Sequence, residues 1–213
     1  MAKSFTYYFV LLAIKCRGIK KIFSQDPINY KLLRKQDVHR PEFTHFENDQ
    51  VSSFQVLDTR VTEIKNNSKK LIIYVHGGAF VFGPLKHHWN TLEKLAESTS
   101  YHLWLCDYPK APEHNITTIN ENIDAVYQAA ADMTCYDEII MMGDSVGGTL
   151  ILTLIQRRIA LKFSLPSLLI LISPVLDASF DNPDCIDVDK KDPMLSITGI
   201  LSANRMCVSQ QNL

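Results

Sequence analysis

Four short, almost purely apolar runs dominate the hydrophobic pattern of the chain. They cover residues 70–75, 102–106, 138–142 and 168–172. Runs of this length without polar alternation are typical of strands that are covered on both faces, as in a parallel sheet. We therefore expect these four segments to form the buried strands of one sheet.

Between these runs, apolar residues recur at the three- and four-residue spacing of amphipathic helices. This spacing predicts helices over about 88–98, 120–133 and 149–160. Upstream, residues 54–57 and 61–64 indicate a pair of short strands with a turn near Asp58. Strands that alternate with helices predict the α/β class, with a mostly parallel sheet and flanking helices on both faces. In such a sheet, functional groups lie at the carboxyl ends of the strands.

The N-terminal part of the chain does not follow this alternation. Residues 5–14 are apolar, and a basic cluster follows at residues 15–21. The apolar run is too short to span a bilayer and lacks the small-residue cleavage site of a signal peptide. We assign residues 1–50 to an N-terminal cap or lid segment and residues 51–213 to the core. The helix expected over 5–14 covers either a ligand pocket, as part of a lid, or a membrane surface.

Composition narrows the class of function. A chain of 213 residues that is 46% apolar is ordered and long enough for one sizeable core. Its 22 basic and 23 acidic residues nearly cancel, which argues against nucleic acid as a partner. The five cysteines are scattered without metal-ligand spacing, so we expect a reducing, cytoplasmic compartment and no metal. Cys106 lies in an apolar run and is expected to be a buried, inert thiol.

The sharpest chemical signal is the segment Gly143–Gly147, a G-x-S-x-G between a predicted strand and a predicted helix. A strand-to-helix turn tight enough to expose a serine hydroxyl tolerates little bulk at its flanks, and the two glycines provide that room. Ser145 is therefore the candidate nucleophile. The N–H of Val146, at the helix N-terminus, points toward negative charge that develops on a substrate oxygen. The plain alternative is a glycine-rich turn with an incidental serine.

A second signal, His76-Gly77-Gly78-Ala79-Phe80, directly follows the strand predicted over 70–75. The tetrahedral intermediate of acyl transfer needs at least two N–H donors, and a glycine turn beside the nucleophile can supply them from the backbone. The alternative is an ordinary turn in which His76 is a structural, hydrogen-bonded residue.

Taken together and in this order, the motifs resemble the hormone-sensitive-lipase-like branch of the α/β-hydrolases, which are serine carboxylesterases and lipases. The resemblance covers about residues 70–195. Residues 76–79 are similar to the family's H-G-G-G loop, with Ala79 in place of the third glycine. Residues 107–114 are similar to its D-Y-R-L-A-P-E-H segment, and residues 143–148 to its G-D-S-A-G-G elbow.

The resemblance implies an α/β-hydrolase fold and hydrolysis of a small-molecule carboxylic ester through an acyl-serine intermediate. Ser145 is then the nucleophile, and Gly77, Gly78, Ala79 and Val146 furnish the amides of the oxyanion hole. Water releases the acyl group, and neither a metal nor an organic cofactor takes part.

One part of the expected machinery has no counterpart in the sequence. In the family, an Asp or Glu and then a His follow the nucleophile, but the last histidine of this chain, His114, precedes Ser145. We also find no further buried strand after residue 172 and read the last strands of the sheet as missing. The chain is therefore expected to be a weak or inactive esterase. His87 or His88 is an alternative base, although solvation at the surface is the simpler explanation of both.

Two further expectations follow from a sheet that lacks its last strands. Its outermost strand exposes an edge and apolar faces, which favours self-association. The chain is also open to two other interpretations: a non-catalytic hydrolase-fold protein that binds a hydrophobic ligand, and a truncated gene product without a function of its own.

Overall fold

The computed structural model describes residues 4–16, 18–39, 42–43, 45–46 and 49–208. Within these residues, six strands form one sheet: β1 (Val51–Val56), β2 (Thr59–Ile64), β3 (Lys70–Val75), β4 (His102–Asp107), β5 (Glu138–Asp144) and β6 (Leu168–Ile172). The helices of the same residues are α1 (Phe5–Cys16), α2 (Ile19–Phe23), α3 (Tyr30–Arg34), α4 (Lys86–Thr99), α5 (Ile116–Ala131), α6 (Val146–Leu161), α7 (Asp184–Lys191) and α8 (Ile197–Val208).

The strand order across the sheet is β1-β2-β4-β3-β5-β6. The four predicted apolar runs form β3, β4, β5 and β6, which pair in parallel. The predicted strand pair forms β1 and β2, an antiparallel hairpin that joins the sheet beside β4. The α/β class and the mostly parallel sheet predicted from the sequence are therefore confirmed.

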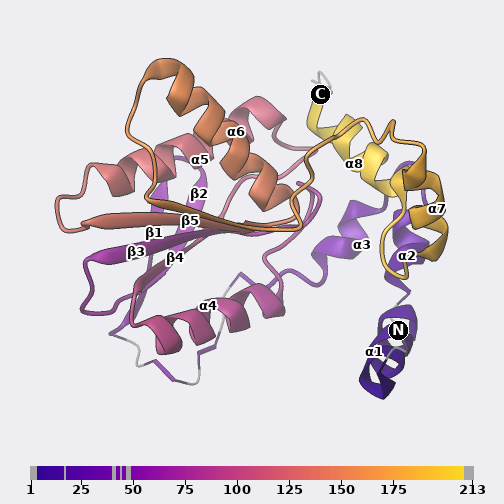
Figure 1. Cartoon of the computed structure of the whole chain (residues 1–213), viewed down its shortest axis with the longest axis horizontal. Coiled ribbons are helices and arrows are strands. Elements are labelled where there is room, and N and C mark those ends of the chain that lie inside the picture. The colour runs from indigo at the N-terminus through magenta and orange to yellow at the C-terminus, as the bar shows by residue number, and fades with distance from the viewer. Residues whose placement is uncertain (1–3, 17, 40–41, 44, 47–48, 209–213) are drawn as a thin grey trace.

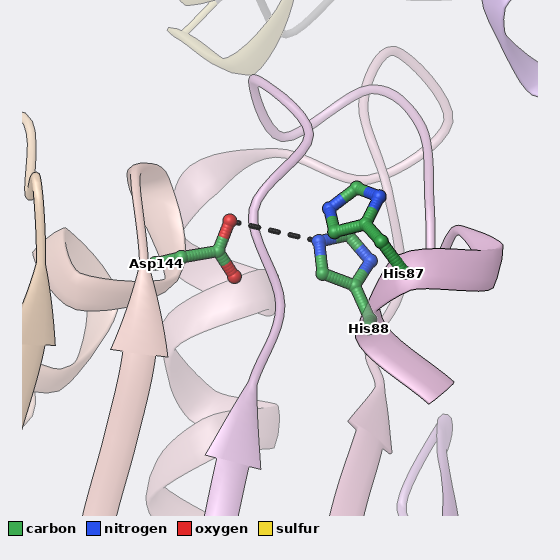
Figure 2. A group of neighbouring side chains, drawn as sticks. All are labelled: His87, His88 and Asp144. Atoms are coloured by element: carbon green, nitrogen blue, oxygen red, sulfur yellow. Dashed lines mark ion pairs between the residues drawn. The ribbon is translucent and has the colours of Figure 1, made fainter. Parts of the chain in front are cut away.

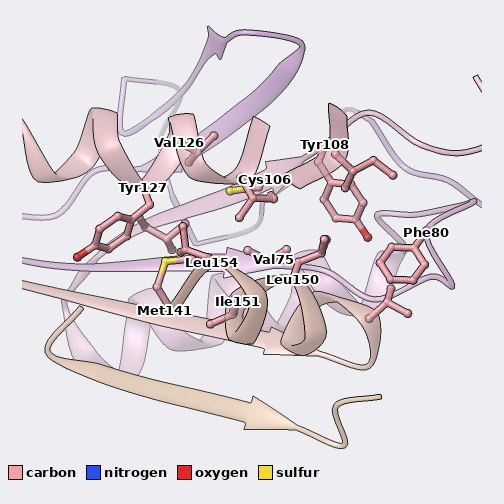
Figure 3. Close-up of a cluster of buried hydrophobic side chains, with 14 of the residues drawn as sticks. Val75, Phe80, Cys106, Tyr108, Val126, Tyr127, Met141, Leu150, Ile151 and Leu154 are labelled. Atoms are coloured by element: carbon pink, nitrogen blue, oxygen red, sulfur yellow. The ribbon is translucent and has the colours of Figure 1, made fainter. Parts of the chain in front are cut away.

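Helices cover both faces of the sheet, with α5 and α6 on one face and α4 on the other (Figure 1). Because side chains alternate along a strand, each buried strand supplies apolar residues to both sides. Val75 and Met141 pack toward α5 and α6 in the larger cluster, part of which Figure 3 shows. Tyr74 and Met142 pack toward α4. This explains why the strands have no polar alternation.

The predicted helices are present but begin earlier than their apolar spacing suggests. Helix α5 begins at Ile116, since the Asn115 side chain caps it by accepting the N–H of Thr118 at 2.9 Å. Helix α6 begins at Val146, directly after the candidate nucleophile. Cys106 is fully buried, as expected, and burial raises the pKa of its thiol.

Helices α2, α3, α7 and α8 form a cap at the carboxyl ends of the parallel strands (Figure 1). Helix α2 packs against α8, and Phe23, Leu33 and Ala203 are buried in the same cluster. The backbone N–H of Ile28 donates to the Ser202 hydroxyl at 2.9 Å and joins the segment between α2 and α3 to α8. The cap therefore combines an N-terminal part with a C-terminal part that the sequence did not predict to be helical.

Helix α1 stands apart from this arrangement. None of its residues is buried, and it extends away from the body of the molecule (Figure 1). Among the described residues, no helix is both long and apolar enough to cross a membrane.

Strand β6 lies at the edge of the described sheet and is only partly covered. Leu168 and Ile172 are 52% and 43% exposed, and apolar side chains near the end of α6, among them Leu161 and Phe163, are also exposed. The edge and apolar surface expected from the sequence are present. Self-association through them remains a prediction.

Candidate active site

Ser145 lies on a sharp bend between β5 and α6. Its backbone has φ 51° and ψ −125°, a combination that non-glycine residues rarely adopt, and its N–H donates to the carbonyl of Ile172 at 2.9 Å. A Cβ at Gly147 would lie 2.1 Å from the carbonyl oxygen of Val75, which leaves no room for a side chain. The strand–turn–helix context that the motif requires is therefore present.

The hydroxyl of Ser145 is accessible from a cavity. The residue is half-buried and lines a cavity of about 300 Å³, and no residue in the described ranges is hydrogen-bonded to its Oγ. A serine oxygen in this position is able to approach a bound ligand.

The loop after β3 lies beside this bend because β3 and β5 are parallel neighbours in register, with Val75 opposite Gly143. Gly78 has φ 129°, and a Cβ there would lie 2.0 Å from the carbonyl oxygen of Phe82. Ala79 also has a positive φ, of 51°. Within the described structure, no acceptor is found for the N–H of either Gly78 or Ala79. Both amides, with that of Val146 at the start of α6, are available to a substrate oxygen.

Gly77 has a different role from the one predicted. Its N–H donates to Oδ1 of Asp144 at 2.9 Å, so this amide is not available to an oxyanion. The expectation that Gly77 supplies an oxyanion amide is corrected accordingly. Its lack of a side chain matters instead, since a Cβ there would lie 2.4 Å from Oδ2 of Asp144 and 3.1 Å from Cβ of Ser145.

Asp144 connects the loop to the elbow. Alternation along β5 directs it to the face that carries α4, where Oδ1 also accepts the hydroxyl of Tyr74 at 2.8 Å and Oδ2 lies 3.5 Å from Nε2 of His88 (Figure 2). Burial raises the pKa of this carboxyl, but hydrogen bonds from His88, Tyr74 and Gly77 outweigh burial and hold the pKa below its ordinary value. The group is therefore a carboxylate that accepts hydrogen bonds from three directions. We call Asp144 and its partners Tyr74, Gly77 and His88 the brace.

His88 is part of this brace and is not placed as a base for Ser145. It is buried, which corrects the expectation of a solvated surface residue. Its Nδ1 accepts the backbone N–H of Leu85 at 2.8 Å, so the proton of the neutral ring is on Nε2, facing Asp144. A nitrogen that already carries its proton cannot accept one from serine. His87 is exposed and lies at the cavity wall.

His76 is a structural histidine, the plainer of the two expectations. It is fully buried, stacks on Tyr108 with ring centroids 4.5 Å apart, and its Nδ1 lies 2.5 Å from the carbonyl oxygen of Gly77. Burial lowers its pKa well below the ordinary value and keeps the ring neutral. The Tyr108 hydroxyl in turn donates to the carbonyl oxygen of His76 at 2.9 Å.

The segment after β4 also fixes the far end of the oxyanion loop. The N–H of Ala111 donates to the carbonyl of Phe80 at 3.0 Å. Arg34 of α3 donates to the carbonyls of Val81 and Ala111, each at 2.7 Å, and pairs with both carboxylate oxygens of Glu113. One arginine thus links the cap, the loop and the segment after β4.

One cluster near the site has the residue types of a metal site. The ligand atoms of His87, His88 and Asp144 lie within 4.8 Å of one another (Figure 2). A metal bound to Nε2 of His88 would require a proton on Nδ1, and that would break the hydrogen bond from Leu85. The cluster therefore fits a hydrogen-bonded brace better than a metal ligand set.

Apolar side chains of the cap form part of the wall of the cavity above Ser145. Helices α2 and α3 contribute Ile19, Phe23 and Leu33, and the C-terminal part of the cap contributes Leu195 and Ile200. The wall begins at Ile19, so the lid role expected for residues 5–14 belongs to α2 and α3 in the described structure. Such a cavity accommodates a small or medium apolar ligand next to the serine.

Sequence reasoning missed the residues that hold the site together. Tyr74 lies within an apolar run, and alternation along β3 was the signal that would have directed it to the side of Asp144. Arg34 lies in a segment with no assigned element, and nothing in its sequence surroundings indicates its partners.

Comparison with known proteins agrees with this geometry. The family model described as alpha/beta hydrolase fold matches residues 72–213. An esterase of Acinetobacter venetianus is 35% identical over 154 residues, which are 71% of this chain and 51% of that protein. An ethyl acetate hydrolase of Pseudomonas putida is 33% identical over 119 residues, 53% of this chain and 37% of that protein. The chain thus spans about half, or less, of the length of these relatives.

Solved structures share the fold. The crystal structure of an esterase from the bacterial hormone-sensitive lipase family superposes with a TM-score of 0.76 at 23% identity, covering 100% of this chain and 71% of that one. The sheet, the elbow and the family match lead to one conclusion: this chain belongs to the alpha/beta hydrolase fold family.

Proposed function

We propose that the chain is a serine hydrolase of small or medium carboxylic esters that acts through an acyl-serine intermediate. The observation that carries this proposal is the accessible hydroxyl of Ser145 beside unpaired backbone amides of the neighbouring loop. The apolar cavity above it supports an ester with a short acyl or alkyl group, and the relatives named esterase and ethyl acetate hydrolase point to the same chemistry.

The geometry suggests the following steps. Oγ of Ser145 attacks the carbonyl carbon of the ester, and the N–H groups of Gly78, Ala79 and Val146 bind the oxyanion that forms. Collapse of this intermediate breaks the bond to the alcohol, which leaves with a proton, and an acyl-serine remains. Water then attacks the acyl carbon and releases the acid and the free serine.

We propose that proton transfer limits this chain. No histidine follows His114 in the sequence, and Nε2 of His88 already carries its proton. Without a base, a site of this type retains about 10³–10⁴-fold catalysis over water from its oxyanion hole and from binding. Acylation by an activated ester is therefore expected to be measurable, and turnover of an alkyl ester is expected to be slow.

A fluorophosphonate probe and p-nitrophenyl acetate test this proposal together. The probe is expected to label the purified chain, and the ester to release p-nitrophenol faster than buffer alone. Both signals should disappear in Ser145→Ala and persist in Ser98→Ala, which changes an exposed serine far from the cavity. Added imidazole should accelerate release in the parent chain by more than its own reaction with the ester, and should not do so in Ser145→Ala. Equal labelling of both variants would refute a reactive Ser145.

A second candidate is a protein that binds an apolar ligand without turnover. It is favoured by the formed cavity in a chain that lacks a histidine after the nucleophile. Calorimetric binding of an uncleaved ester in the micromolar range, without labelling by the probe, would select this function over the hydrolase.

A further inference from the structure

Helix α1 presents apolar side chains to solvent along its whole length. Phe5, Phe9 and Leu12 are 89%, 67% and 60% exposed, Tyr8 is 57% exposed and Val10 is 48% exposed. The helix extends from α2 away from the sheet and from the rest of the cap (Figure 1). An exposed apolar surface of this kind marks an interaction site.

The distribution of these side chains decides between possible occupants. At 100° per residue, Phe5, Phe9 and Leu12 lie on one side of the helix, whereas Tyr7 and Val10 lie on the opposite side. A second copy of the chain would cover one stripe and leave the other exposed. A helix that is apolar all round instead fits a medium that surrounds it, such as the interior of a lipid bilayer.

The charges next to α1 complement one type of membrane. Residues 1–25 contain five basic residues and no Asp or Glu. Lys20 pairs with Asp189, but Lys15 and Lys21 are exposed, and no acidic partner is present for either within the described residues. Basic residues that follow an apolar helix are attracted to anionic headgroups.

The length of α1 limits how deeply it inserts. Twelve residues at about 1.5 Å per residue span about 18 Å, against about 30 Å for the hydrocarbon core of a bilayer. We therefore propose that α1 inserts into one leaflet of a membrane that carries anionic lipids, with residues 15–21 at the level of the headgroups. Since Ile19 and Phe23 of the adjoining α2 line the cavity above Ser145, the insertion brings the cavity close to the lipid surface.

Vesicle flotation tests the insertion independently of any enzymatic activity. The chain is expected to float with vesicles of equal parts phosphatidylcholine and phosphatidylglycerol, and to float at least about tenfold less with phosphatidylcholine alone or at high salt. The double variant Phe9→Asp/Leu12→Asp is expected to stay with the free protein. A matched control, Leu161→Asp/Phe163→Asp, changes side chains of similar exposure at the end of α6 and should float like the parent chain.

Depth is measured with Phe9→Trp. The new tryptophan should be quenched by lipids brominated on their acyl chains, while the native Trp89 and Trp104 are buried and remain unquenched. Flotation that is unchanged in Phe9→Asp/Leu12→Asp, or no quenching from the acyl chains, would overturn the proposal. So would a dimer, seen by analytical ultracentrifugation, that dissociates in Phe9→Asp/Leu12→Asp while the parent chain fails to float.

Discussion

Replacing Asp144 by alanine should destabilise the chain far more than an ordinary Asp-to-Ala change. The substitution removes the acceptor for the Tyr74 hydroxyl at 2.8 Å and the Gly77 N–H at 2.9 Å, and the weaker contact with His88 at 3.5 Å. An unsatisfied buried donor costs about 1–3 kcal/mol. Because the Asp144 side chain is 23% exposed, water replaces part of these bonds, and we expect a loss of about 3 kcal/mol in the free energy of unfolding.

The matched control is Asp124→Ala. Asp124 makes two hydrogen bonds to Arg157, at 2.7 and 2.8 Å, but both side chains are about one third exposed. An exposed pair of this kind contributes about 0.2–1 kcal/mol. Equilibrium unfolding in urea measures both variants against the parent chain. Equal losses, within about 0.5 kcal/mol, would refute the idea that Asp144 braces the loop against the elbow.

The same carboxylate makes a prediction about pH. Its pKa is lower in the folded chain than the ordinary value of about 3.9, so its contribution to stability is fully present above that value and is lost as the pH falls through the folded pKa. The difference in stability between the parent chain and Asp144→Asn should be constant above about pH 5 and shrink below about pH 4. A difference that stays the same down to pH 3, roughly one unit below the ordinary pKa, would contradict this assignment.

Three further predictions concern the turn and a partner of Asp144 on β3, and they are checked by thermal unfolding. Ser145→Gly should raise Tm by several degrees, because glycine relieves a strained backbone that costs about 1–3 kcal/mol; a lower Tm would argue against strain. Gly147→Ala should lower the free energy of unfolding by more than 3 kcal/mol, roughly the upper end for overpacking, since its Cβ meets the backbone oxygen of Val75. The control Gly18→Ala, at a position with a positive φ but open space, should lower it by only about 1 kcal/mol. Similar losses in the two variants would exclude the steric explanation. Tyr74→Phe should cost about 1 kcal/mol for one hydrogen bond, and no loss would mean that this bond is not formed in solution.

The sheet and the elbow could be predicted because their signals are local. The apolar runs from residue 70 onward follow from strands buried on both faces. Gly143 and Gly147 both stand two positions from Ser145, so the turn motif is readable in the sequence, although the oxygen that excludes a side chain at Gly147 belongs to Val75 on the neighbouring strand. The start of α5 was placed too late because its apolar stripe already begins at Ile116 and Ile119, directly after the capping side chain of Asn115.

The brace around the site could not be predicted in the same way. The partner of Asp144 on α4, His88, depends on where the long loop after β3 returns to the sheet, and no spacing in the sequence encodes that position. The amide of Gly77 was assigned to the substrate because the glycine pattern alone does not reveal that Asp144 already accepts its hydrogen. Of the C-terminal cap helices, α7 was missed because it buries no side chain. Helix α8 was missed because the face that it buries consists of small or polar residues, Gly199, Ser202, Ala203 and Cys207, and not of a large apolar stripe.

The N-terminal and C-terminal parts of the cap can pack together only late in the synthesis of the polypeptide. The hydrogen bond between Ile28 and Ser202 joins residues that are 174 positions apart. During synthesis, the first helices leave the ribosome long before α8 exists, while the sheet between them is free to form. A nascent chain is thus able to form the turn at Ser145 before the cavity above it is covered, because covering the cavity requires α8 to be synthesised. Until then, Ser145 faces an open groove that lacks the cap side chains Leu195 and Ile200.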